Sequence, residues 1–129
     1  MIKTNAFDYI NVLDKAADAS WLRNEAIANN LANVNTPGYK REDVTFESEL
    51  SKALKHSNFK TMDDKVKHLR TDQLQPRTYK DYNGFSYRLD GNNVDVDTEN
   101  TILAKNQLMY EGLLNSISQE FDNLRTAMK

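Results

Sequence analysis

Apolar residues near the start of the chain recur at alternating steps of three and four residues. Six of the eight positions in this series are apolar, and the series consists of Ile10, Leu13, Ala17, Ser20, Asn24, Ile27, Leu31 and Val34. Such steps place side chains on one face of a helix that packs against a partner helix. Asn5 with Asp8 can cap its start, and Thr36-Pro37-Gly38 is typical of its end. The pattern predicts a helix over residues 5–34.

A second apolar series lies near the end of the chain. Four of its members recur every seven residues, and they are Leu103, Tyr110, Ile117 and Leu124. Three more follow the last three of these by four residues, namely Leu114, Phe121 and Met128, and Leu113 widens the stripe. Asp97 or Thr98 is the expected N-cap, with Glu99 in the first turn. This series predicts a helix over residues 98–128.

The stretch between these helices is less regular. Phe46, Leu50 and Leu54 step by four and predict a short helix over 45–55, whereas residues 56–84 show no clear period. Residues 85–89 alternate apolar and polar as a half-buried strand does, residues 90–93 have turn chemistry, and residues 94–96 are a candidate second strand. We therefore expect a small β-hairpin between the long helices.

Together these elements predict a mainly α fold. Two long terminal helices, each roughly 45 Å long at 1.5 Å per residue, pair as a coiled coil. A small irregular or β-hairpin middle segment connects them. We divide the chain into an N-terminal helix and motif over 1–40, a middle segment with a short helix and β elements over 41–89, which we call the outer segment, and a turn with the C-terminal helix over 90–129.

Composition narrows the possible classes. Leu, Ile, Val and Phe account for 29 of the 129 residues, which is just above the level of about 20% that signals disorder, so the core of the chain alone should be thin. The absence of cysteine excludes disulfides, thiolate metal sites and a cysteine nucleophile. A net charge of −2 provides no global attraction for nucleic acid or anionic lipid. No membrane span and no cleavable signal peptide are recognisable.

Candidate chemistry is sparse. The acidic run from Asp90 to Glu99 resembles a calcium loop only superficially, because position 5 would be Val94 and position 6 would be Asp95 rather than glycine. His56 and His68 are twelve residues apart and do not form a helical zinc pair. Neither a nucleophile elbow nor a phosphate-binding glycine loop occurs. We expect a protein that is not an enzyme, with no metal, cofactor, small-molecule substrate or nucleic-acid partner.

Two features on the first helix have two interpretations each. Four asparagines, Asn24, Asn29, Asn30 and Asn33, are either a solvated helix end or amides that bridge to neighbouring chains. Trp21 is either partly buried against its own chain or an anchor in a subunit interface, where tryptophan is enriched.

Two longer motifs lie at the inner ends of the predicted helices. The first runs from Ala28 to Lys40 and reads ANNLANVNTPGYK, and the second runs from Asp90 to Glu99 and reads DGNNVDVDTE. In sequence, order and spacing they resemble the bacterial flagellar basal-body rod and hook family. The short chain and the Asn-Thr-Pro-Gly-Tyr ending of the first motif are most similar to the proximal rod members of that family.

The resemblance implies a structural subunit of the proximal rod, located in the flagellar basal body and exported through the flagellar type III apparatus without signal cleavage. The implied partners are further copies of the chain, FlgC-, FlgF- and FlgG-type rod subunits, a FliE-type adaptor, the membrane-ring protein and the export apparatus. A soluble coiled-coil adaptor or export chaperone stays open as an alternative, and a metal-dependent enzyme that uses the Asp90–Glu99 cluster is a more remote one.

The expected functional residues fall into two groups. The coiled-coil and assembly interface comprises Leu13, Ile27, Leu31, Val34, Leu103, Tyr110, Leu113, Ile117 and Leu124. The family motif comprises Asn30, Asn33, Pro37, Gly38 and Tyr39, which the resemblance places at the joint between helix and outer segment.

Overall fold

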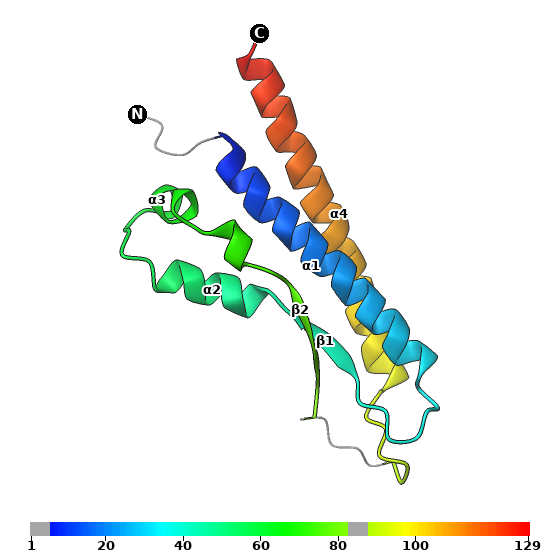
Figure 1. Cartoon of the computed structure of the whole chain (residues 1–129). Coiled ribbons are helices and arrows are strands. Elements are labelled where there is room, and N and C mark those ends of the chain that lie inside the picture. The colour runs from blue at the N-terminus through cyan, green and yellow to red at the C-terminus, as the bar shows by residue number, and fades with distance from the viewer. Residues whose placement is uncertain (1–5, 83–87) are drawn as a thin grey trace.

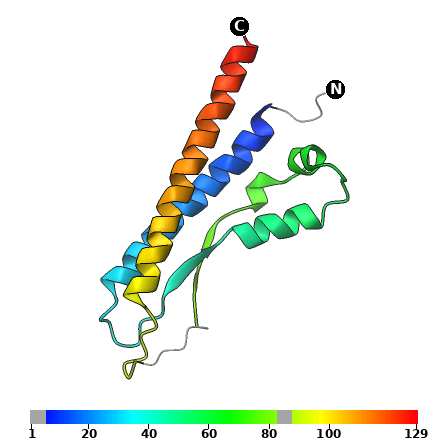
Figure 2. The same ribbon diagram turned by 180° about the vertical axis from the view of Figure 1, so that it is seen from behind.

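The computed structural model describes residues 6–82 and 88–129. In chain order its elements are α1 (Ala6–Ala32), β1 (Glu42–Thr45), α2 (Glu47–Lys55), α3 (Met62–Lys67), the 3-10 turn η1 (Thr71–Gln73), β2 (Arg77–Lys80) and α4 (Val96–Ala127). Helices α1 and α4 run antiparallel along each other, and the outer segment from β1 to β2 lies on the other side of α1 (Figures 1 and 2). The predicted fold class is confirmed.

The ends of the long helices lie within two residues of the predicted ones. The cap expected at Asn5 lies outside the described residues. At the start of α4 the prediction of Asp97 or Thr98 as N-cap is wrong, because Asp95 has extended backbone angles and caps the helix. Its carboxylate accepts hydrogen bonds from the Asp97 N–H at 3.2 Å and from the Thr98 hydroxyl at 2.8 Å. Both predicted caps therefore belong to the first turn.

The β structure is present but not where the pattern placed it. Strands β1 and β2 pair antiparallel, with Glu42 opposite Lys80 and Thr45 opposite Arg77. Of the predicted hairpin over 85–89 and 94–96, residues 85–87 lie outside the described residues, and the second strand is wrong. Val94 lies in an irregular loop, and its backbone N–H donates to Asn92 Oδ1 at 2.8 Å. This local side-chain bond replaces a strand-to-strand bond.

Residues 56–84 contain short elements that the hydrophobic pattern did not predict. Helix α3 has six residues, η1 has three and β2 has four. Thr61 caps α3 by accepting from the Asp64 N–H at 3.2 Å. A helix of six residues spans fewer than two turns, so it cannot display a period. The predicted helix over 45–55 corresponds to α2.

The main buried cluster joins α1 to the outer segment. It contains Ala19 and Ala26 of α1 together with Val44, Phe46 and Leu74, and Leu22, Leu50 and Leu69 pack against it. Alanine at two of the α1 positions lets β1 and Phe46 approach the helix closely. This cluster lies between α1 and the outer segment, while Ile10, Ala17 and Ile27 of α1 are buried outside it.

The seam of α4 is the stripe of better-buried residues that repeats every seven residues. The apolar pattern predicted only part of it. Its better-buried positions include Glu99, Leu103, Asn106, Tyr110, Leu113, Ile117, Glu120 and Leu124. The assignment of Leu114, Phe121 and Met128 to this stripe is wrong, because their side chains are 45%, 47% and 81% exposed. Within each repeat of seven, the second buried position follows the first by three residues, not by the predicted four. Asn106 and Glu120 occupy two of these positions, so hydrophobicity alone could not identify the step.

Candidate functional site: the joint between the terminal helices

The two sequence motifs meet at the end of the molecule where α1 ends and α4 begins (Figure 1). The Gly38 N–H donates to the Asp90 carbonyl at 2.7 Å. Gly38 and Gly91 have φ angles of 73° and 78°, which glycine adopts at little cost. Because both turns bend in this way, the loop after α1 can lie directly against the loop before α4.

Asn92 binds the turn that follows α1 from a distant part of the chain. Its side chain is fully buried, and its Nδ2 donates to the carbonyls of Asn33, Val34 and Thr36 at 2.9, 3.0 and 2.9 Å. These three residues follow the end of α1 at Ala32. The second motif therefore satisfies backbone carbonyls of the turn that closes the first motif.

Asn30 is the buried amide of the first motif. Its Oδ1 accepts from the Glu42 N–H at 2.7 Å, and its Nδ2 donates to the Glu42 carbonyl at 2.8 Å. The Tyr39 hydroxyl donates to the same Oδ1 at 3.1 Å. The amide thus pairs with β1 as a neighbouring strand would. Neither sequence interpretation covers all four asparagines, because Asn30 is buried whereas Asn29 is exposed.

Glu99 and Arg41 form the charged centre of the joint. Glu99 is fully buried; its Oε1 accepts from Arg41 Nε at 2.7 Å and its Oε2 from Asn30 Nδ2 at 3.2 Å. Arg41 also donates to Asp81 at 2.8 Å and lies 3.5 Å from Asp43. Burial lowers the pKa of Arg41, but its hydrogen bonds to Glu99 and Asp81 outweigh burial and raise the pKa above its ordinary value. One guanidinium therefore connects α4, β1 and the segment after β2.

A second arginine fixes the outer segment to the middle of α1. Arg23 holds both oxygens of the Glu47 carboxylate, at 2.8 and 2.7 Å, and donates to the Val44 carbonyl at 3.2 Å. The hydrogen bond from Arg23 lowers the pKa of Glu47 despite partial burial. This contact is a polar attachment of the outer segment to α1 that is separate from the joint.

The predicted interface residues lie on the two long helices with different burial. Ile27 is buried. The others are half-buried, and they are Leu13, Leu31, Val34, Leu103, Tyr110, Leu113, Ile117 and Leu124. Among the motif residues, Asn30 is buried, Asn33 and Tyr39 are half-buried, and Pro37 and Gly38 are exposed. The Asn33 side chain donates to the Asn29 carbonyl at 2.8 Å.

Sequence reasoning missed the central residues of the joint. It assigned Glu99 only a place in the first turn of the C-terminal helix and Asn92 only a place in a turn, and it gave Arg41 no role. The one available signal was the position of Glu99 on the heptad of α4, four residues before Leu103. A carboxylate at a seam position requires a buried partner, and Arg41, directly after the first motif, was one basic candidate.

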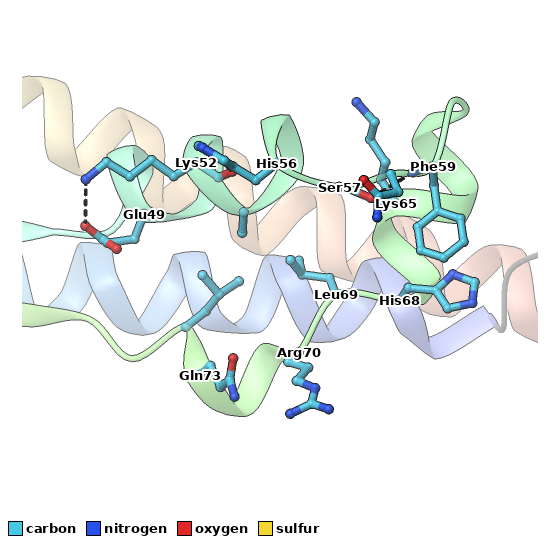
Figure 3. Close-up of a pocket in the computed structure, with 13 residues that line it drawn as sticks. Glu49, Lys52, His56, Ser57, Phe59, Lys65, His68, Leu69, Arg70 and Gln73 are labelled. Atoms are coloured by element: carbon cyan, nitrogen blue, oxygen red, sulfur yellow. Dashed lines mark hydrogen bonds and ion pairs between the residues drawn. The ribbon is translucent and has the colours of Figure 1, made fainter.

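The outer segment carries a hollow of about 730 Å³ between α2, α3 and η1, which Figure 3 shows with its lining side chains. His68 stacks on Phe59 with ring centroids 4.0 Å apart. The Nδ1 atoms of His56 and His68 lie 2.9 and 2.8 Å from the carbonyls of Lys52 and Asp64. Both imidazoles thus bond to the ends of their own helices.

The described residues contain neither a candidate metal centre nor a candidate membrane span. No group of three or more histidine, aspartate or glutamate side chains in residues 6–82 and 88–129 is placed to hold a metal ion. None of the helices within these residues combines the length and the hydropathy that crossing a bilayer requires.

Comparison with known proteins identifies the family to which the chain belongs. Residues 10–40, which contain the first motif, match the family model described as flagella basal body rod protein. The flagellar basal body rod protein FlgB of Bacillus subtilis is 32% identical, over 92% of each chain. The FlgB protein of Borreliella burgdorferi is 34% identical over 87% of this chain and 89% of its own, and that of Escherichia coli is 32% identical over 83% of each.

The chain belongs to the FlgB family of flagellar basal body rod proteins. The resemblance inferred from the two motifs is therefore confirmed. The chain is a structural component of the rod in the flagellar basal body, and other components of the rod are its partners. At 92% of this chain, the match with the Bacillus subtilis protein is long enough to include both long helices and the joint.

Proposed function

We propose that this chain is a subunit of the proximal rod that reaches the basal body unfolded, through the flagellar type III apparatus and without signal cleavage. Its partners in this proposal are further copies of the chain, FlgC-, FlgF- and FlgG-type subunits above it, and a FliE-type adaptor and the membrane-ring protein below it. The single observation that carries the proposal is the incomplete burial of the α1–α4 pair.

This incomplete burial is clearest on α4. Leu108, Leu114 and Phe121 are 72%, 45% and 47% exposed, and Trp21 of α1 is 55% exposed. Exposed aromatic and leucine side chains on neighbouring helices mark a surface that a partner covers. In the rod, the long helices of adjacent subunits cover these side chains. The predicted interface residues then complete their burial against sister helices as well as against each other.

The joint keeps the shape of each subunit constant. A tube requires every copy to hold its outer segment at the same angle to its helix pair. Asn30 bonds α1 to β1, and Tyr39 bonds the loop before β1 to Asn30, while Pro37 and Gly38 allow the turn that brings the two motifs together. This is the role that we propose for the family motif, which also includes Asn33.

Composition supports export in an unfolded state. The chain has no cysteine that could form a disulfide. Its main apolar cluster includes two alanines among five buried residues. A small core implies a small free energy of unfolding, because apolar burial is the main favourable contribution to folding. Such a chain unfolds at low energetic cost before it enters a narrow channel.

The test replaces a half-buried seam leucine near the joint. Leu31→Asp should block rod assembly and swimming while the protein is still synthesised, because a carboxylate on the seam lacks a partner. Leu89→Asp is the matched control, since Leu89 is fully exposed in the turn before α4. Normal swimming of the Leu31→Asp strain, or equal loss in both strains, would contradict the proposed seam.

A measurement on the purified chain separates this function from the soluble coiled-coil adaptor. A rod subunit should sediment as a monomer until assembly is nucleated. A stable helical oligomer at micromolar concentration, observed by sedimentation together with circular dichroism, would favour the adaptor and contradict our proposal.

A further inference from the structure

A cleft of about 280 Å³ opens between α1 and α4, halfway along the pair. Trp21 and Tyr110 line it, with ring centroids 6.1 Å apart and planes at 47°. Glu111 and Gln107 of α4 also line it, and none of the described residues that form its wall is basic. The cleft therefore combines aromatic ring faces with a carboxylate.

Two buried side-chain oxygens that lack a hydrogen-bond partner among the described residues belong to residues that line this cleft. Asn106 Nδ2 donates to the Ser20 carbonyl at 2.8 Å, which leaves Asn106 Oδ1 and Ser20 Oγ without a hydrogen-bond partner among the described residues. Both side chains are at least nine-tenths buried. An unpaired acceptor in a site of low dielectric adds negative potential to that of Glu111. The electrostatics of the cleft thus favour a cation.

The same chain carries a cation at an uncovered helix end. The last turns of α4 extend beyond the start of α1 in both views (Figures 1 and 2). The Arg125 side chain is 71% exposed and has a 3.5 Å ion pair with Asp122, one turn away. Phe121 and Met128, at four residues before and three residues after Arg125, share its helix face and are exposed. The C-terminal tip of α4 therefore exposes an arginine between two apolar side chains.

We propose that the α1–α4 cleft of one subunit receives Arg125 from the α4 tip of a second copy. A guanidinium stacks on tryptophan and tyrosine faces, and its planar fork bonds a carboxylate better than an ammonium does. Phe121 and Met128 of the second copy then cover exposed Trp21 and its surroundings. Because tip and cleft are different surfaces, the contact is head-to-tail and can continue from copy to copy. The inference rests on the proposed function, since it names one contact within the rod.

The first test exchanges the charges in cells that have the altered chain as their only copy. Arg125→Glu and Glu111→Arg should each lower the number of assembled rods at least tenfold, whereas Arg125→Lys should keep part of the assembly. The double variant Glu111→Arg with Arg125→Glu should restore assembly, which a purely structural role for either residue would not produce. Arg77→Glu on β2 is the control for loss of an exposed cation. No loss in the single variants, or no recovery in the double variant, would overturn the inference.

The second test uses the absence of native cysteine. We place Gln107→Cys at the cleft and Met128→Cys at the tip of one chain and treat isolated basal bodies with a short thiol cross-linker. The two positions are 21 residues apart on one helix, roughly 32 Å, so a link within one chain is impossible. The double variant should give dimers and larger products, and neither single variant should.

The outcomes also separate this inference from the proposed function. Dimers from Met128→Cys alone would show a tip-to-tip contact and overturn the inference. Assembled rods that contain the double variant without cross-links would overturn it as well, and would leave the proposed function standing. If the unaltered chain is missing from basal bodies, both fail together.

Discussion

The two long faces of α1 are buried in different ways. The face toward the outer segment packs Ala19 and Ala26 against Val44, Phe46 and Leu74, all of which are buried. Of the six apolar residues in the predicted series on the face toward α4, three are buried and three are half-buried, and the α4 partner positions include the polar residues Glu99 and Asn106. The first face has the character of a closed interior, and the second has that of an interface. The difference indicates which half of the subunit is complete alone and which half depends on neighbours.

The comparison predicts unequal effects of removing one large side chain from each face. Phe46→Ala should lower the free energy of unfolding by about 3–5 kcal/mol, since a buried phenylalanine leaves a cavity. Leu113→Ala on the half-buried seam should lower it by about 1–2 kcal/mol. Denaturation by urea of the purified chains measures both. Equal losses would show that the helix pair is already a closed core.

The next largest effect concerns the joint, where the two faces are connected. Glu99→Ala should lower the free energy of unfolding by about 3 kcal/mol, because removal of one partner leaves Arg41 as a buried charge. The loss should lie at the low end of the range for such pairs, since Arg41 keeps Asp81. Glu111→Ala, an exposed glutamate of the same helix, is the control. A joint without energetic importance would give the same small change in both variants.

The smallest expected effect concerns a contact between the start of α1 and helix α3. The Tyr9 hydroxyl donates to the Asp63 carboxylate of α3, and this hydrogen bond raises the pKa of Tyr9 from 10.0 to about 12. The folded chain therefore holds this proton between pH 10 and 12 while the unfolded chain loses it. The stability that the contact contributes is complete below pH 10 and is lost as the pH rises toward 12.

Tyrosinate absorbance during alkaline titration measures this pKa. In Asp63→Asn the Tyr9 component should titrate at lower pH, because the amide lacks the charge that favours the protonated phenol. Tyr9→Phe identifies the component by removing it. Unchanged titration in Asp63→Asn would mean that α3 does not hold α1 in solution.

The sequence by itself determined the two long helices and the place where they end. A repeat of three and four residues over about eight turns leaves few alternatives to a packed helix, and Pro37 with Gly38 prevents the first helix from continuing beyond the turn that follows Ala32. The two motifs were sufficient to indicate the family, because each is long and specific. Local chemistry and periodicity therefore account for α1, α2 and α4 almost completely.

Only the tertiary structure decided which residues the joint uses and which face of α1 is the core. Asn92 and Asn30 make local sense as turn and helix residues, but their amides bond to segments 58 and 12 residues away. The sequence has no period that pairs Glu99 with Arg41, since a buried ion pair depends on three-dimensional proximity rather than on spacing. The apolar cluster formed against β1 and Phe46 because two alanines permit close approach there, whereas buried polar residues such as Glu99 and Asn106 interrupt the apolar seam with α4.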